Sequence, residues 1–92
     1  MYGSIRRYRV TNAEEFTEKV NASFINVLRK VPGFISYTAI DEGSGSWASM
    51  SLFVTKEGVT QSDRLAAEWI SQNAAHLVAG PPEITEGVVV VR

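Results

Sequence analysis

Two kinds of hydrophobic pattern divide the chain. Four short stretches are rich in β-branched and aromatic residues, which predicts β-strands. These stretches are residues 3–10, 34–41, 47–55 and 84–92. Two longer stretches place apolar residues three or four positions apart, which predicts helices over 12–31 and from 58–61 to about Val78. The elements therefore follow the order β-α-β-β-α-β.

The first helix has recognisable start and end signals. Asn12 stands three residues before Glu15, the spacing of a helix-capping box. The pair Pro32-Gly33 ends the helix. Between them runs one apolar stripe, formed by Phe16, Val20, Phe24, Val27, Leu28 and Val31. This helix should bury one side along its whole length.

The glycine-rich stretch EGSGS, residues 42–46, separates two predicted strands. A glycine-rich loop that binds phosphate would join a strand to a helix, so these residues predict a hairpin turn instead. In the strand that follows, alternate residues belong to opposite faces. One face carries Ala48, Met50, Leu52 and Val54, and the other carries Trp47, Ser49, Ser51 and Phe53.

This order of elements predicts an α+β fold of the ferredoxin-like type: a four-stranded antiparallel sheet with two helices on one face. The 92 residues are enough for a single domain, residues 1–92, with one core. No internal repeat or low-complexity linker interrupts it.

Apolar residues are predicted on both faces of this sheet, although two helices cover only one. Trp47 and Phe53 oppose Met50 and Leu52, and the valines at 88–91 alternate between the faces. A bare apolar sheet face would aggregate. We therefore expect a homodimer in which two sheets pack against each other through this face.

Composition excludes several classes of function. The formal net charge of −1 gives no field for nucleic acid or an anionic membrane. The absence of cysteine excludes disulfides and thiolate metal sites, and a single histidine makes a transition-metal site improbable. No apolar run is long enough for a membrane span, and the N-terminus lacks the pattern of a signal peptide. We expect a cytoplasmic protein without a metal.

The second helix carries polar residues within its apolar stripe. At about 100° per residue, Ser62, Asn73 and His76 fall within about 60° of the centre of the stripe that includes Trp69. Buried polar groups need hydrogen-bond partners. One interpretation is that these residues bond to the backbone or lie at the margin of the core. The other is that helix and sheet enclose a small-molecule pocket lined by these four side chains.

Strand residues add further candidates. Arg6 and Arg7 are adjacent in the first strand, so their side chains point to opposite faces. That strand is central in a ferredoxin-like sheet, so one arginine should point inward, where it needs a carboxylate or an anionic ligand. Tyr37 and Tyr8 could present a hydroxyl to the same cavity or simply pack in the core.

Three stretches carry a resemblance to a known family: LRKVPGFISY after the first helix, AAEWISQNAAHL in the second helix, and the final apolar strand. With this order of elements, the chain resembles the antibiotic-biosynthesis-monooxygenase-like group of the dimeric α/β-barrel superfamily. More closely, it is similar to short, functionally uncharacterised bacterial proteins that begin with MY…IRRY and end with PPEIT.G. The resemblance spans nearly the whole chain.

The resemblance implies a homodimeric barrel with a cavity between sheet and helices in each subunit. Some relatives oxidise aromatic phenols with dioxygen and no cofactor, using tryptophan, asparagine and tyrosine side chains, to which Trp69, Asn73 and Tyr37 loosely correspond. Others bind haem through a histidine of the second helix. His76 lies closer to Trp69 than that pattern expects, and Arg7 stands where it expects asparagine, so both departures count against haem.

These observations lead to three hypotheses. The first is a cofactor-independent monooxygenase acting on a small aromatic or quinone-like compound. In it, Trp69, Asn73 and His76 are catalytic, with His76 as a possible general base, and the substrate is bound by Ser62, Tyr37, Arg6 and Arg7. The second is a non-catalytic binding or accessory homodimer that holds a small apolar ligand or a partner. Haem binding is the third and weakest.

Overall fold

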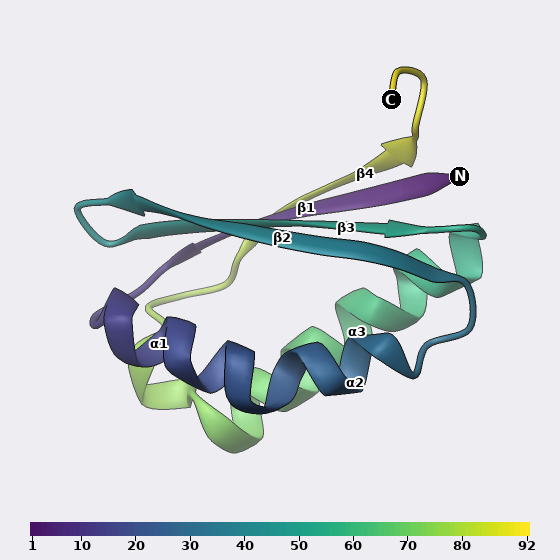
Figure 1. Cartoon of the computed structure of the whole chain (residues 1–92). Coiled ribbons are helices and arrows are strands. Elements are labelled where there is room, and N and C mark those ends of the chain that lie inside the picture. Colours follow the sequence, from purple (N-terminus) through teal and green to yellow (C-terminus); the bar gives the residue numbers. More distant parts are fainter.

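The computed structural model describes residues 1–92 and has the predicted order of elements (Figure 1). The elements are β1 (Tyr2–Arg9), α1 (Ala13–Lys19), the π-helical turn η1 (Val20–Phe24), α2 (Ile25–Arg29), β2 (Phe34–Gly43), β3 (Ser46–Phe53), α3 (Lys56–Asn73), the 3₁₀ turn η2 (Ala75–Leu77) and β4 (Glu83–Val88). The strands form one antiparallel sheet in the order β2-β3-β1-β4. The helices lie on one face of it, which confirms the ferredoxin-like α+β fold. We call this face inner and the opposite face outer.

The first helical region is continuous but not uniform. Asn12 caps it as predicted, because its side chain accepts a hydrogen bond from the Glu15 amide at 3.0 Å. Its buried residues Phe16, Val20, Phe24 and Leu28 are each four positions apart. Steps of four drift by about 40° each on an ideal α-helix. The wider π-helical turn at Val20–Phe24 offsets part of this drift, so all four side chains reach the core.

Helix α3 begins earlier than the apolar pattern predicts. Thr55 caps it, and its side chain accepts a hydrogen bond from the Gly58 amide at 3.2 Å. Gly58 lies against Phe53, where an added Cβ would come within 2.9 Å of the phenylalanine ring. A larger residue would push α3 away from the end of β3. The glycine therefore sets how closely this helix packs on the sheet.

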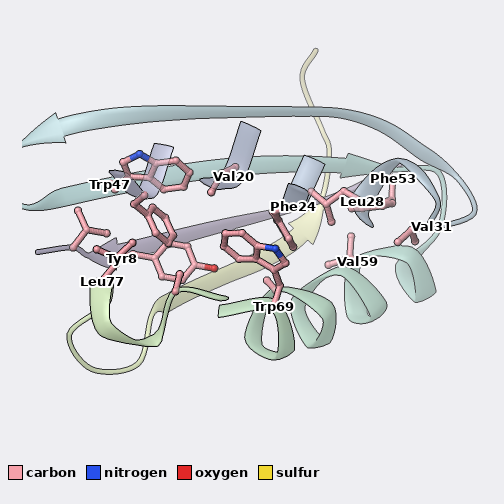
Figure 2. Close-up of a cluster of buried hydrophobic side chains, with 14 residues drawn as sticks. Tyr8, Val20, Phe24, Leu28, Val31, Trp47, Phe53, Val59, Trp69 and Leu77 are labelled. Carbon is pink, nitrogen blue, oxygen red and sulfur yellow. The ribbon is translucent and has the colours of Figure 1, made fainter. Parts of the chain in front are cut away.

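The core lies between the inner face and the helices (Figure 2). Its centre is aromatic: the Phe16 ring packs edge-on against Trp47 at 4.7 Å between centroids, and Phe24 packs against Trp69 at 5.3 Å. Such pairs contribute beyond their buried area. The sheet supplies Tyr8, Trp47 and Phe53, and the helices supply the facing residues.

The outer face is open and partly apolar. Ile5 pairs with Met50, and both side chains are exposed there, as is Ile40 of β2. Trp47 and Phe53 lie on the inner face, so the predicted alternation of β3 is confirmed. No helix of the chain is long and apolar enough to cross a membrane.

The last strand is shorter than predicted. β4 ends at Val88, which pairs with Tyr2 at the start of β1, and only one further backbone bond follows, from Val89 N to Met1 O. The strand ends because its partner strand ends. The prediction that 84–92 forms a strand is therefore wrong for residues 89–92, of which Val90 and Val91 are 88% and 87% exposed. Figure 1 shows the C-terminal residues leaving the sheet on the side away from the helices.

Candidate functional site

A buried arginine forms the centre of the polar part of the inner face. Arg6 of β1 is only 1% exposed. Its Nη1 donates to Asp63 Oδ1 at 2.7 Å and more weakly to Ser62 Oγ at 3.4 Å, and its Nη2 donates to Ser51 Oγ at 3.1 Å. A buried charge is tolerated when it is paired and hydrogen-bonded, and Asp63 of α3 provides that pairing. The inward arginine predicted from the strand pattern is therefore Arg6, and its partner is a carboxylate.

This network leaves three buried polar atoms without a partner among the protein atoms: Arg6 Nε, Ser49 Oγ and Asp63 Oδ2. Ser49 lies directly opposite Arg6 in the β1–β3 ladder, so both belong to the same part of the inner face. Buried polar atoms are nearly always hydrogen-bonded. The cluster thus offers two hydrogen-bond donors and one acceptor that no other protein group uses.

Two tyrosines lie beside the arginine. Burial raises the pKa of Tyr37 to about 12, although the positive charge of Arg6 opposes the shift. Burial likewise raises the pKa of Tyr8, again against the charge of Arg6. Both phenols therefore stay protonated near neutral pH. They can donate hydrogen bonds to a ligand, but they cannot act as bases.

Trp69 forms one wall of a narrow void in the core. The indole is 6% exposed, and its Nε1 donates to Ser23 Oγ of the π-helical turn at 2.7 Å. The void measures about 10 Å³ and is enclosed by apolar and aromatic side chains, among them Tyr37 and Tyr8. That volume is about one water molecule. The void is too small for an aromatic compound.

A larger groove opens beside it, between α3, the loop before β4, and β4. This α3–β4 groove measures about 360 Å³, and its lining includes Arg6, Tyr8, Asp63, Ile70, Pro82 and Ile84. Its size lies within the range of small-molecule sites. Tyr8 and Ile70 line both the groove and the void, so they separate the two spaces. An apolar ring in the groove would lie beside a buried cation.

The structure brings four predicted site residues to the inner face. Trp69 and Tyr37 line the same void, and Arg6 is bonded to Ser62. Ser62 is fully buried, and its hydroxyl donates to the Val59 carbonyl at 2.8 Å. Ser62 is therefore satisfied within its own helix, as the simpler interpretation of the polar stripe proposes.

Asn73 and His76 lie outside this face, which corrects their predicted inward placement. Asn73 is exposed in the last turn of α3, and its Nδ2 donates to the Trp69 carbonyl at 3.0 Å. The helix ends there, because Ala74 has φ −143° and ψ 21°. The angle of about 100° per residue, which placed His76 on the inward stripe, therefore does not apply beyond Ala74. The His76 side chain is 66% exposed, and its Nε2 lies 3.5 Å from Glu15 Oε2.

Arg7 lies on the outer face. It forms a two-pronged ion pair with Glu42 of β2, through Nε at 2.9 Å and Nη2 at 3.1 Å. The pair spans β3 above Ala48, which is buried although it belongs to the open face. Arg7 is thus separated from the groove by the sheet.

Asp63, Tyr8 and Ser49 contribute to the site but were not among the predicted site residues. Tyr8 was recognised only as a possible cavity residue, and Ser49 carried no signal beyond the alternation of β3. Asp63 could have been found from the requirement that an inward arginine have an anionic partner. No three His, Cys, Asp or Glu side chains gather as metal ligands would.

Comparisons with known proteins identify the fold. No family model and no curated protein sequence matches the chain. Among solved structures, a protein of unknown function from Nitrosomonas europaea is 19% identical, with 99% of this chain and 90% of that chain aligned at a TM-score of 0.78. SnoaB, a cofactor-independent oxygenase from Streptomyces nogalater, is 14% identical, with 99% and 94% aligned at 0.74.

A monooxygenase from the gene ActVA-Orf6 of Streptomyces coelicolor, solved in complex with nanaomycin D, is 16% identical. Here 99% of this chain and 92% of that chain align, at a TM-score of 0.74. Identities this low establish the fold rather than the activity. The chain therefore has the fold of the antibiotic biosynthesis monooxygenases over its whole length, which confirms the structural part of the resemblance.

Proposed function

We propose that the protein is a cofactor-independent monooxygenase that oxidises a small aromatic or quinone-like compound in the α3–β4 groove. The observation that carries this proposal is the buried Arg6, whose guanidinium lies at a groove of about 360 Å³ and keeps one N–H without a protein partner. The shared fold with SnoaB and the ActVA-Orf6 monooxygenase supports the reaction class.

The proposed reaction needs only the substrate and dioxygen. A phenol and dioxygen give a quinone and water: one oxygen atom forms a new bond to a ring carbon, the O–O bond breaks, and the second oxygen leaves as water with the two hydrogens lost by the substrate. The substrate itself is the reductant. Negative charge develops on the phenol oxygen, and a preorganised cation stabilises such charge in a site that excludes water.

We assign different roles to the residues around the groove. Arg6 stabilises the anionic oxygen, while Tyr8 orients it by hydrogen bonding. Trp69 and Tyr37 support the aromatic wall behind Tyr8. Asn73 and His76 do not contribute to this site, since both are exposed away from it, and the same position of His76 gives no support to haem ligation.

We also propose that the active protein is a homodimer joined through the outer face. Ile5 and Met50 form an apolar centre there, beside a hollow of about 420 Å³ that Leu52 and the C-terminal valines help to line. A second copy of the same face would cover these side chains and give the exposed valines at 90–91 a surface to pack on.

Substitution at the rim of the groove tests the site without removing the buried charge. Ser71 lines the groove, whereas its neighbour Gln72 is exposed and does not. Ser71→Trp should fill the groove and weaken the binding of naphthols, anthrones or hydroquinones at least about tenfold. Gln72→Trp is the matched control and should bind like the wild type. Oxygen uptake and product absorbance measured on the same panel report turnover.

The main alternative is a non-catalytic dimer that holds a small apolar ligand. It is favoured by the absence of a histidine at the groove and by the raised pKa values of Tyr8 and Tyr37, because neither phenol can then act as a base there. Binding that is lost in Ser71→Trp, without oxygen uptake from any compound, would support this alternative. Equal binding by Ser71→Trp and Gln72→Trp would contradict both functions.

A further inference from the structure

The Asp63 carboxylate is satisfied on one oxygen only. Its Oδ1 accepts hydrogen bonds from Arg6 Nη1 and from Ser4 Oγ, both at 2.7 Å. Its Oδ2 is enclosed and receives no hydrogen bond from a backbone, hydroxyl, amide or cationic donor. An enclosed acceptor without a donor destabilises the fold, because it has lost its hydrogen bonds to water. A donor for Oδ2 should therefore be sought among its neighbours.

Glu86 of the edge strand β4 is that neighbour. It stands directly opposite Ser4 in the β1–β4 ladder, so its side chain lies on the inner face beside the serine that binds Asp63. The neighbouring Asp63 side chain is the main reason why the pKa of Glu86 is raised above its ordinary value, and burial adds to the shift. A carboxyl group can donate to a carboxylate only while it holds its proton.

We propose that Glu86 and Asp63 form a proton-dependent clamp that ties the edge strand β4 to helix α3 at one end of the α3–β4 groove. With its proton, Glu86 donates to Asp63 Oδ2 and closes the contact. Without it, two carboxylates face each other and the contact opens. Because Ile84, two residues earlier, forms part of the groove wall, opening of the clamp loosens that wall.

The groups around Glu86 determine where the clamp titrates. The charged and titratable side chains that face it are Asp63 and Lys56 of α3, Arg6 and Tyr2 of β1, and Arg92 of the C-terminal segment. Asp63 favours the protonated form, while the cations Lys56 and Arg6 favour the ionised form. The influence of Asp63 is the largest of these effects.

The sign of the pH dependence follows from the raised pKa. A carboxyl group that binds its proton more tightly in the folded state stabilises that state at low pH, and this contribution is lost as the pH rises through the folded-state pKa. The clamp itself does not depend on the proposed activity. Its effect on ligand entry rests on the proposed function.

A single substitution removes the proton dependence and keeps the bond. In Glu86→Gln, the amide is a permanent donor to Asp63 Oδ2. Glu83→Gln is the control, because Glu83 belongs to the same strand but lies on the outer face opposite Arg7. The carboxyl carbons are followed by NMR during a pH titration, and amide hydrogen exchange in β4 is compared between the variants at each pH.

We expect the Glu86 carboxyl to titrate above the ordinary value of a glutamate. Above the Glu86 midpoint, the amides of β4 should exchange faster in the wild type and in Glu83→Gln than in Glu86→Gln. A Glu86 carboxyl that titrates at the ordinary value, with equal exchange in all three proteins at every pH, would overturn the clamp. If the clamp titrates as expected but phenol binding does not change across the midpoint, the clamp stands and the groove is not the ligand site.

Discussion

Arg6 and Arg7 are neighbours in β1, yet the two faces of the sheet give them opposite roles. Arg6 is buried against helix α3 and bonds to Asp63, Ser62 and Ser51. Arg7 lies on the open face and pairs with Glu42 in solvent. The inner arginine organises a cluster next to a groove, and the outer one covers a small residue of β3. The face of the sheet to which each side chain points, rather than the residue type, decides which arginine can contribute to a binding site.

The same contrast extends to the rest of each face. The inner face holds polar groups that are buried and almost fully hydrogen-bonded, and those few without partners mark the candidate site. The outer face holds apolar side chains that remain exposed in the single chain. We propose that a ligand completes the inner face and that a second copy of the chain completes the outer face.

Replacing the inner arginine should have the largest effect on stability. Arg6→Met leaves the Asp63 carboxylate buried without its cation, and breaking such a pair costs about 3–5 kcal/mol. Arg7→Met is the matched change on the outer face and should alter stability little, because exposed ion pairs contribute weakly. Urea denaturation of both variants measures the difference.

The double variant Arg6→Met, Asp63→Leu sharpens this result. Removing both charges leaves no isolated carboxylate, so the double variant should be more stable than Arg6→Met alone. Equal losses of stability for Arg6→Met and Arg7→Met would contradict the distinction between the faces.

A charge at the centre of the outer face should affect assembly while leaving the fold intact. Met50 is exposed and lies opposite Ile5. Met50→Lys would bury an unpaired ammonium group in the proposed interface, so sedimentation should show a monomer where the wild type sediments as a dimer. The circular dichroism spectrum should stay unchanged.

The control for this experiment lies on the helical surface. Gln61→Lys changes the charge by the same amount on α3, away from the outer face. A wild type that sediments as a monomer, or a dimer that survives in Met50→Lys, would show that the outer face is not the interface.

The sequence predicts the fold well because its signals are local. The capping residue Asn12, the Pro-Gly pair and the alternation of β3 each act within a few residues, and each is confirmed. The order of elements then determines the sheet, since few arrangements satisfy it. The end of β4 was not predictable in this way, because it depends on where the partner strand β1 begins.

The candidate site was only partly predictable for a related reason. An inward arginine followed from the central position of β1, but its partner Asp63 lies 57 residues away in sequence. His76 and Asn73 were placed on the inner face by extending a regular helix, and the turn at Ala74 breaks that regularity. Chemistry that depends on contacts between distant elements therefore needs the three-dimensional structure.

The smallest expected effect compares two glutamates on opposite faces. The hydrogen bond from Arg7 lowers the pKa of Glu42, helped by one from Ser46, whereas the pKa of Glu86 on the inner face is raised. The Glu42 contribution to stability is therefore present at neutral pH and lost as the pH falls through its lowered pKa, the reverse of Glu86.

Glu42→Gln should weaken the acid sensitivity of unfolding slightly, and added salt should reduce the difference because the pair is exposed. Glu18→Gln on α1 is the control and should follow the wild type, because Glu18 is exposed and lies outside the first turn of its helix. Thermal unfolding across an acid pH series measures all three, and a Glu42→Gln profile that matches the wild type at low salt would mean that the outer ion pair does not contribute.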